Sequence, residues 1–180
     1  MTREGKLISD GFGYWLAGLT DGEGTFNIVT DPHVGFRFQI NLRQDDIPTL
    51  QYIQKNVGFG KIYIRKVCNK PTYSKNGDIY QSKPSAAFSV QKRKDLSAIN
   101  NIFKKYPLQS KKGHDFEIWS TALDYYLSRP FGSKRTSMEK TYFREAFQKL
   151  RSVREYQAMA INFSLPVTIQ LDLFDHAQAP

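Results

Sequence analysis

The sequence predicts an α+β fold, in which helices cover one face of an antiparallel sheet and the other face stays polar. Three observations support this class. Predicted strands come in two pairs, each pair follows a predicted helix, and residues 36–43 alternate strictly between apolar and polar side chains. The expected order is helix, strand, strand, helix, strand, strand, helix (αββαββα), with extra helices after it.

The first helix is expected from about residue 11 to residue 20, with Ser9 or Asp10 as its cap. Two strands follow, at 25–30 and 36–43. Their inward side chains are Phe26, Ile28, Phe36, Phe38, Ile40 and Leu42, and their outward side chains are Thr25, Asn27, Val29, Arg37, Gln39, Asn41 and Arg43. The outward face of this pair is therefore basic and rich in amides.

The same order then repeats. A helix with Pro48 in its first turn is expected to end at Gly58. Strands are expected at 61–67 and 86–91, with a polar loop at 69–84 between them. Their inward side chains are Ile62, Ile64, Ala86, Phe88 and Val90, and their outward side chains are Lys61, Tyr63, Arg65, Ala87, Ser89 and Gln91. The two pairs together give a four-stranded sheet.

The rest of the chain reads as helical, at 95–105 and 112–127. Thr136 and Glu139 then form a capping box, which opens a helix to about residue 160. Its apolar stripe is expected to be Tyr142, Ala146, Phe147, Leu150 and Val153. Residues 1–180 are interpreted as one domain, with a core at about 9–128 and a helical extension and tail at about 129–180. The tail, Ser164–Pro180, is either an edge strand or an arm onto a partner subunit.

The positive charge of the chain is concentrated in one segment. The net charge is +9, from 26 Lys and Arg against 17 Asp and Glu. Residues 61–94 contain nine basic residues and one acid, Asp78, and therefore carry net +8. A solvated charged face is the plainer interpretation, but such faces on helices usually mix signs and this segment does not. Tyrosines lie between the basic residues, which favours a nucleic-acid surface.

Composition also limits the classes of protein to consider. A single cysteine, Cys68, excludes an internal disulfide. No apolar run approaches the roughly 18 residues of a membrane span, and the N-terminus has no signal-peptide core. We therefore expect an intracellular protein, cytoplasmic or organellar, that is not secreted and has no membrane partner.

The most informative segment is Leu16–Gly24, with the sequence LAGLTDGEG. Glycine costs roughly 1 kcal/mol against alanine inside a helix, so Gly18 and Gly22 need a reason to be there. They lie four residues apart, beside Tyr14 and Ala17, and small residues at this spacing let two helices approach closely. A second copy of the helix would bring two Glu23 carboxylates together at a negative helix end, an arrangement that suits a hard cation such as Mg²⁺.

This segment resembles the LAGLIDADG motif of homing endonucleases, with Thr20, Gly22 and Glu23 in place of Ile, Ala and Asp. The plainer alternative is an amphipathic helix with a C-terminal glycine cap. One motif copy resembles the homodimeric branch of the family, and the resemblance implies a helix interface formed by Tyr14, Ala17, Gly18, Asp21 and Gly22. It also implies a four-stranded saddle that reads a pseudo-palindromic target in the major groove of double-stranded DNA.

Outward side chains of the strands would make the DNA contacts that the resemblance implies, with an ordinary solvated strand face as the alternative for each position. The candidates are Thr25, Asn27, Val29, Arg37, Gln39, Asn41, Arg43, Lys61, Tyr63, Arg65, Lys70, Lys75, Ser89 and Gln91. Arginine and lysine suit guanine or phosphate, whereas glutamine and asparagine suit adenine.

The implied reaction is hydrolysis of one phosphodiester in each strand, leaving short 3′ overhangs, as in proteins encoded within mobile introns. Mg²⁺, with Mn²⁺ as the alternative, would be held by Glu23 and the main-chain carbonyl of Gly22. Gln44, and either Lys111 or Lys112, match the polar side chains that the family places around the attacking water. Asp21 is interpreted as a structural residue, which caps or pairs at the helix end.

Two other functions are weighed, of which only the first uses the same scaffold. One is a splicing cofactor (maturase) for intron RNA, or a non-catalytic DNA-binding regulator, although retention of Glu23 argues against pure binding. The other is a generic basic RNA-binding domain, which leaves Gly18 and Gly22 of the motif helix unexplained.

Overall fold

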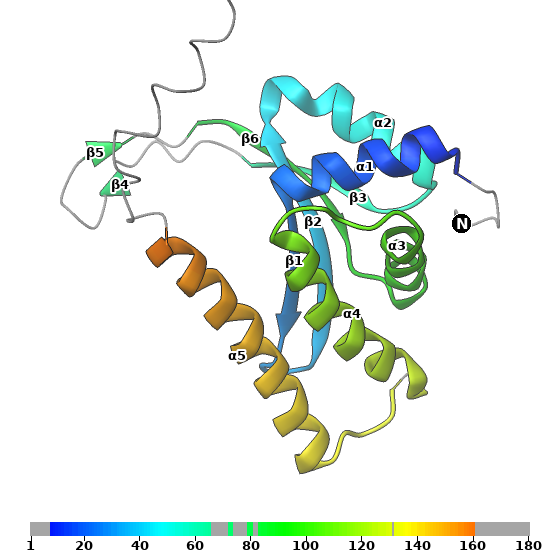
Figure 1. Ribbon diagram of the computed structural model, residues 1–180, viewed down its shortest axis with the longest axis vertical. Helices are drawn as coiled ribbons and strands as arrows, with labels where there is room; N and C mark the ends of the chain where they lie inside the picture. Colours follow the sequence, from blue (N-terminus) through cyan, green and yellow to red (C-terminus); the bar gives the residue numbers. More distant parts are fainter. Residues whose placement is uncertain (1–7, 66–71, 74–78, 81–82, 131, 161–180) are drawn as a thin grey trace, which may run out of the picture.

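The computed structural model describes residues 8–65, 72–73, 79–80, 83–130 and 132–160, and it confirms the α+β class (Figure 1). The helices are α1 (Asp10–Glu23), α2 (Ile47–Val57), α3 (Arg93–Lys105), α4 (Lys112–Ser128) and α5 (Ser137–Ala160), and a 3₁₀ turn, η1, covers Gln44–Asp46. The main strands are β1 (Gly24–Val29), β2 (Gly35–Arg43), β3 (Lys61–Arg65) and β6 (Ser85–Val90). The chain order up to α3 is the predicted αββαββα, with α4 and α5 as the extra helices.

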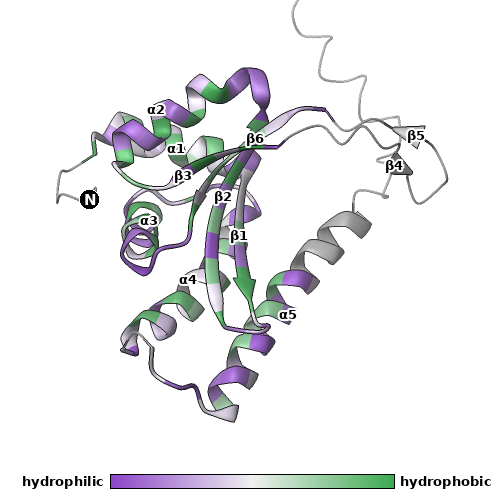
Figure 2. Ribbon diagram, turned by 180° about the vertical axis from the view of Figure 1, so that it is seen from behind, coloured by the Kyte–Doolittle hydropathy of each residue, from purple (hydrophilic) through white to green (hydrophobic). Residues whose placement is uncertain are grey.

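The four main strands form one antiparallel sheet in the order β1-β2-β6-β3. Helices α1, α3 and α4 cover one face of it (Figure 1). The view from behind shows the strands on the opposite face (Figure 2). The sheet therefore has one face in the core and one face free of helices, which is the arrangement that the alternating strands predict.

Aromatic side chains fill the space between the sheet and the helices. The ring of Phe26 lies 5.3 Å from Phe38, 5.8 Å from Phe103 and 5.1 Å from Trp119, measured between ring centroids. Trp119 also donates a 3.1 Å hydrogen bond from Nε1 to the carbonyl of Asn27. Strands β1 and β2 bury the apolar residues that were predicted to point inward, apart from half-buried Leu42.

Two elements of the second half differ from the prediction. The polar loop predicted at 69–84 contains a second, two-stranded sheet, in which β4 (Thr72–Tyr73) pairs with β5 (Ile79–Tyr80). Ile64, predicted to point inward, is 56% exposed because β3 is an edge strand, which among the described strands pairs with β6 alone. Val67 lies outside the described residues, and so does the tail Ser164–Pro180.

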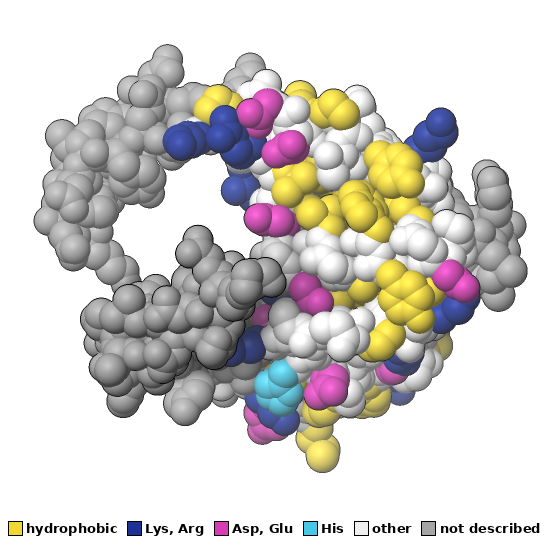
Figure 3. Space-filling model, turned by 45° about the horizontal axis from the view of Figure 1, so that its top comes forward, with side chains coloured by type: hydrophobic (Ala, Val, Ile, Leu, Met, Phe, Trp, Pro, Cys, Tyr) yellow, Lys and Arg dark blue, Asp and Glu magenta, His cyan; other side chains and the backbone are white. Residues whose placement is uncertain are grey.

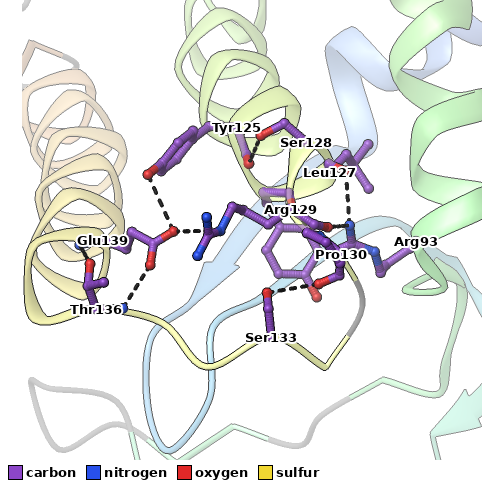
Figure 4. Close-up of polar contacts among 10 residues, drawn as sticks. Arg93, Tyr125, Leu127, Ser128, Arg129, Pro130, Ser133, Thr136 and Glu139 are labelled. Carbon is purple, nitrogen blue, oxygen red and sulfur yellow. Dashed lines mark hydrogen bonds and ion pairs between the residues drawn. The ribbon is translucent and has the colours of Figure 1, made fainter.

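A network of polar contacts fixes the junction between α4 and α5 (Figure 4). The guanidinium of Arg93 donates to three main-chain carbonyls at the end of α4, those of Tyr126 (3.0 Å), Leu127 (3.0 Å) and Arg129 (2.7 Å). A helix leaves its last carbonyls without partners inside the helix, so Arg93 acts as a C-terminal cap. This basic residue of the 61–94 segment therefore serves the fold.

The predicted capping box opens α5. The main-chain N–H of Thr136 donates to Glu139 Oε2 (2.7 Å), and the N–H of Glu139 donates to Thr136 Oγ1 (3.2 Å). The Glu139 carboxylate also pairs with Arg129 at 3.0 Å. These contacts hold the pKa of Glu139 below its usual value, chiefly through the N–H of Thr136 and then the charge of Arg129. Of the predicted α5 stripe, Leu150 is buried and Tyr142, Ala146 and Phe147 are half-buried against the core, and Phe143, which was not predicted, is fully buried. None of the helices in the described part of the chain is long and apolar enough to cross a membrane.

Candidate functional site

The register of the sheet places the outward side chains in rows across the face that has no helices. One row runs from β1 to β3 through Thr25, Gln39, Ser89 and Lys61. Neighbouring rows contain Asn27 with Arg37, Asn41 with Ala87 and Tyr63, and Arg43 with Ser85 and Arg65. Most of the predicted contact residues on the strands are thereby brought onto one surface.

Strand β2 has two polar atoms on this surface without a hydrogen-bond partner among the described residues. They are Nε of Arg37 and Oδ1 of Asn41, and both atoms are buried. A buried donor or acceptor left unpaired costs about 1–3 kcal/mol, so such atoms in a native protein require an explanation. A ligand that supplies an acceptor to Arg37 and a donor to Asn41 would satisfy both.

One candidate contact on β6 is covered by its neighbours. Ser89 lies in the outward row, as predicted, but it is only 4% exposed, and Ala87 is 2% exposed. The reason is the central position of β6, because longer side chains on β2 and β3 flank these short ones on the same face. Gln91, just beyond the strand, is exposed and donates a 3.3 Å hydrogen bond to Ser89 Oγ.

Thr25, Asn27 and Gln39 are half-buried in these rows, and the remaining candidates differ in exposure. The edge strand exposes Lys61, Tyr63 and Arg65, and β1 exposes Val29. Arg43 is exposed but paired with Asp45 at 3.0 Å, so a DNA contact would compete with this ion pair. The last two candidates, Lys70 and Lys75, lie outside the described residues.

The outer face of α1 has glycines that its own chain does not explain. A Cβ added at Gly18 or at Gly22 would meet nothing within 4 Å. In contrast, a Cβ at Gly24 would lie 2.4 Å from Thr20 Cγ2, so the fold itself requires that glycine. Tyr14 lies four residues before Gly18 on the same face and is 62% exposed. This face leaves room for the close approach of another helix.

Ala17 does not belong to that face, contrary to the prediction. It is 4% exposed because the helical period places it with Leu16 and Thr20 against the core. Two aromatic residues that carry no signal in the sequence pattern lie at the same surface, Trp15 (40% exposed) and Tyr52 (51% exposed), with their rings 5.3 Å apart. Hydrophobic side chains gather over α1 and α2 in the tilted view (Figure 3).

The C-terminal end of α1 brings together an acid, main-chain carbonyls and a lysine. Glu23 is the last residue of the helix and is exposed, as is Gly22. Lys112 lies at this end, because its Nζ donates a 2.7 Å hydrogen bond to the carbonyl of Gly24. Lys111, the alternative position in the predicted register, is the exposed residue before α4. The geometry therefore places Lys112 beside the motif.

Gln44 lies at the same end of the sheet. Gly24 pairs with Ile40, and Gln44 follows β2 four residues later, about 13 Å along a strand that rises about 3.3 Å per residue. Its main-chain N–H donates to the carbonyl of Pro84 at 3.1 Å, and its side chain is exposed.

Asp21 uses both carboxylate oxygens to hold the chain before α4. Its Oδ2 accepts from the N–H of Gln109 (2.8 Å), and its Oδ1 accepts from the N–H (3.1 Å) and the hydroxyl (2.7 Å) of Ser110. These partners were not found from the sequence, because the contact joins residues far apart in the chain.

The residues at the end of α1 fit a magnesium ion. Glu23 supplies a carboxylate, and a helix ends with carbonyls that have no partner inside the helix, of which Gly22 contributes one. Hard oxygen ligands in small number are what Mg²⁺ takes while it keeps several waters. No group of three or more His, Cys, Asp or Glu able to hold a metal occurs among the described residues. One protomer therefore offers a partial oxygen-ligand set.

A hollow of about 550 Å³ opens at the edge-strand side of the sheet. Its lining includes Lys61, Tyr63 and Gln91 together with Lys55 and Lys92, and the last two were not singled out from the sequence. It extends the basic surface from β3 toward α2 and α3.

The fold and this site define a class of α+β protein in which one face of an antiparallel sheet is free of helices and the first helix has an open glycine face beside it. A family model described as LAGLIDADG endonuclease matches residues 16–123. The chain belongs to the LAGLIDADG endonuclease family, which confirms the resemblance given by the motif.

Relatives and solved structures are consistent with this membership. The chain is 29% identical over 119 residues to "Probable intron-encoded endonuclease 3" of Neurospora crassa, a match that covers 61% of this chain and 20% of the relative. It is also 29% identical over 119 residues to "Probable intron-encoded endonuclease Cox1-I1b" of Schizosaccharomyces pombe, covering 62% and 27%. The chain thus spans about a quarter or less of the length of these relatives.

Among solved structures, the LAGLIDADG meganuclease I-AabMI, crystallised with uncleaved DNA, is 30% identical with a TM-score of 0.53, covering 78% of this chain and 43% of that one. The homing endonuclease I-LtrWI, crystallised with its target DNA, has a TM-score of 0.61 at 22% identity, covering 83% and 47%. I-TnaI, also a homing endonuclease, has a TM-score of 0.56 at 22% identity and is covered over 96% of its length, with 80% of this chain. At 22% identity, the similarities to I-LtrWI and I-TnaI show a shared fold alone.

Proposed function

We propose that this chain is one half of a metal-dependent homing endonuclease. In this proposal two protomers pair through α1 and bind a long pseudo-palindromic stretch of double-stranded DNA. The dimer cuts both strands and leaves short 3′ overhangs. The observation that carries the proposal is the end of α1, where exposed Glu23 follows two glycines, Gly18 and Gly22, that face open space in their own protomer. Pairing of two such faces places two carboxylates near a two-fold axis.

The sheet supports DNA as the substrate. Rows of amide, hydroxyl and basic side chains suit base edges in the major groove, and the net charge of +9 suits phosphates. The unpaired polar atoms of Arg37 and Asn41 would gain partners there. The relatives named as probable intron-encoded endonucleases support a protein encoded in an intron, acting inside the cell or organelle that carries it.

The residues at the end of α1 have different roles in the proposed hydrolysis. Glu23 and the Gly22 carbonyl would hold Mg²⁺, whose chemistry when bound would be to stabilise charge on the phosphate and to activate water. Lys112 keeps a positive charge beside the scissile phosphate, which stabilises the transition state by electrostatics. Gln44 orients water from the end of β2, at the same end of the sheet.

Substitution of Glu23 tests the proposal. The DNA target is first obtained as the joined exon sequence around the host intron, or by selection from a random library. Glu23→Gln should abolish cleavage in Mg²⁺ and retain DNA affinity, whereas Glu145→Gln, at an exposed acid of α5, should leave both unchanged. Full cleavage by Glu23→Gln would overturn the role of Glu23. Specific retention of intron RNA by a wild-type chain that cleaves no DNA would support the splicing cofactor.

A further inference from the structure

The position of the Lys112 side chain depends on contacts made by its own backbone. Its Nζ lies 2.7 Å from the carbonyl of Gly24, the residue after Glu23. A lysine side chain loses up to about 2 kcal/mol of rotamer entropy when it is held in one place, so its starting point must be well fixed. Here the main-chain N–H of Lys112 donates to Ser110 Oγ at 3.1 Å.

Ser110 is fixed in turn by α1. Both its N–H and its hydroxyl donate to Oδ1 of Asp21, at 3.1 Å and 2.7 Å. Asp21 stands two residues before Glu23 on the last turn of α1. Hydrogen bonds therefore connect Asp21 to Ser110 and Ser110 to the backbone of Lys112. The side chain of Lys112 in turn bonds to Gly24, at the same end of α1 as Asp21.

The chain around Ser110 also follows a tight path. The carbonyl of Ser110 accepts from the N–H of Gly113 at 2.9 Å, and a Cβ at Gly113 would lie 3.3 Å from the carbonyl oxygen of Leu108. The hydroxyl of Ser110 thus has a defined direction, and it donates to Asp21 while it accepts from Lys112.

We infer that Asp21 and Ser110 are positioning residues, which hold the ammonium of Lys112 at the end of α1 that carries Glu23. The effect of this positioning on cleavage rests on the proposed function, in which the charge of Lys112 lies beside the scissile phosphate. The hydrogen bonds themselves exist in the protomer without DNA, so the positioning can be measured apart from cleavage.

Kinetics at saturating DNA give the first test. Ser110→Ala should lower the single-turnover cleavage rate roughly tenfold, about the effect of one lost hydrogen bond, with the DNA dissociation constant unchanged. Ser110→Thr keeps the hydroxyl and should recover most of the rate. Ser128→Ala is the matched control, since it removes a serine hydroxyl from the other end of α4, where Ser128 Oγ donates to Tyr125 O.

A double-mutant cycle separates positioning from a general structural effect. In a Lys112→Ala background, Ser110→Ala should cause little further loss, because both changes act through the same ammonium group. Additive losses would overturn the inference, as would an unchanged rate in Ser110→Ala or equal losses in Ser110→Ala and Ser110→Thr. If the wild-type protein cleaves no DNA, the proposed function fails, and the next measurement decides the positioning alone.

Chemical labelling of lysines provides that measurement without DNA. Acetic anhydride should acetylate exposed Lys111 faster than half-buried Lys112 in the wild-type protein, as read by fragment mass spectrometry. In Ser110→Ala and in Asp21→Asn, the Lys112 rate should rise toward that of Lys111, which serves as the internal reference. A Lys112 rate unaffected by both substitutions would overturn the inference.

Discussion

The ring of Tyr106 occupies the space that a side chain at Gly13 would need. A Cβ at Gly13 would lie 2.3 Å from Cε2 of Tyr106, and the Tyr106 hydroxyl donates a 2.7 Å hydrogen bond to Asp10 Oδ1. Tyr106 follows α3 directly, so this contact sets how closely α1 approaches the end of α3. The path of the motif helix is thereby fixed at its start as well as at its acidic end.

The first prediction concerns this contact. Gly13→Ala should lower the free energy of unfolding by roughly 1–3 kcal/mol, the usual cost of overpacking, even though alanine favours helix. Gly18→Ala is the matched control on the same helix, and at open space it should stabilise the protomer by up to about 1 kcal/mol. Urea unfolding of both variants, at a concentration where the chain is monomeric, provides the comparison. Equal changes would contradict the packing described here.

The second prediction concerns assembly. Gly18→Leu should shift the chain from dimer to monomer in sedimentation velocity, because a leucine side chain blocks the close approach of a second α1. Gln148→Leu places the same side chain at an exposed position of α5 and should leave the dimer intact. A wild-type chain that stays monomeric with DNA bound would contradict pairing through α1.

The third prediction concerns acid stability. The pKa of Asp10 is held below its usual value of 3.8, chiefly by the hydrogen bond from Tyr106 and then by Lys105. A depressed carboxylate pKa contributes stability above that usual value, and the contribution is lost as pH falls through the lower folded pKa. Asp10→Asn should therefore destabilise the protein at neutral pH, and the difference from wild type should shrink below about pH 4. The midpoints of urea unfolding of wild type and Asp10→Asn, measured across this pH range with Glu145→Gln as control, would show this change. A difference between the two midpoints that stays constant with pH would contradict the prediction.

The fourth prediction concerns Arg93. Arg93→Ala leaves three carbonyls at the end of α4 without their charged donor and should cost roughly 1.5–3 kcal/mol of stability. Arg93→Lys should recover only part, because an ammonium does not reproduce the guanidinium fork. Lys94→Ala, at the exposed neighbour, should leave stability unchanged. Thermal unfolding would show the order, and equal stability of the Arg93 and Lys94 variants would refute a capping role.

The fifth prediction concerns recognition. Arg37→Ala and Asn41→Ala should each weaken binding of the cognate DNA by about 1–3 kcal/mol and relax its base preference. Neither should destabilise the free protomer, because Arg37 Nε and Asn41 Oδ1 have no hydrogen-bond partner within the part of the chain that the structure describes. Fluorescence anisotropy with single-base variants of the target would give both quantities. Loss of protomer stability in either variant would mean that the atom has a partner in the free chain.

Local signals in the sequence identified much of the fold. Alternation along 36–43 gave the two faces of β2, and Thr136 with Glu139 marked the start of α5. The motif also gave the position of Glu23 at the end of α1, because Gly24 directly after it is the C-cap of the helix. Such features depend on residues only a few positions apart.

Other features depend on which helices and strands become neighbours in space, and local sequence patterns do not predict those neighbours. Ser89 is covered because β6 lies between β2 and β3, an order that skips along the chain. Ala17 lies one position from Gly18 but faces the core. The position of Lys112 beside the motif likewise needed the fold, because it depends on a contact with Gly24, far away in sequence.

The short side chains of β6 make the contact surface uneven. Ala87 and Ser89 sit between Asn41 and Tyr63 in one row and between Gln39 and Lys61 in the next. These long side chains cover Ala87 and Ser89, so a duplex edge laid across the rows would touch β2 and β3 rather than β6. A larger residue at position 87 or 89 would push the covering side chains aside, because the space above β6 is already filled. We therefore expect substitutions at these two positions to rearrange the proposed DNA-contacting side chains of β2 and β3 without removing any of them.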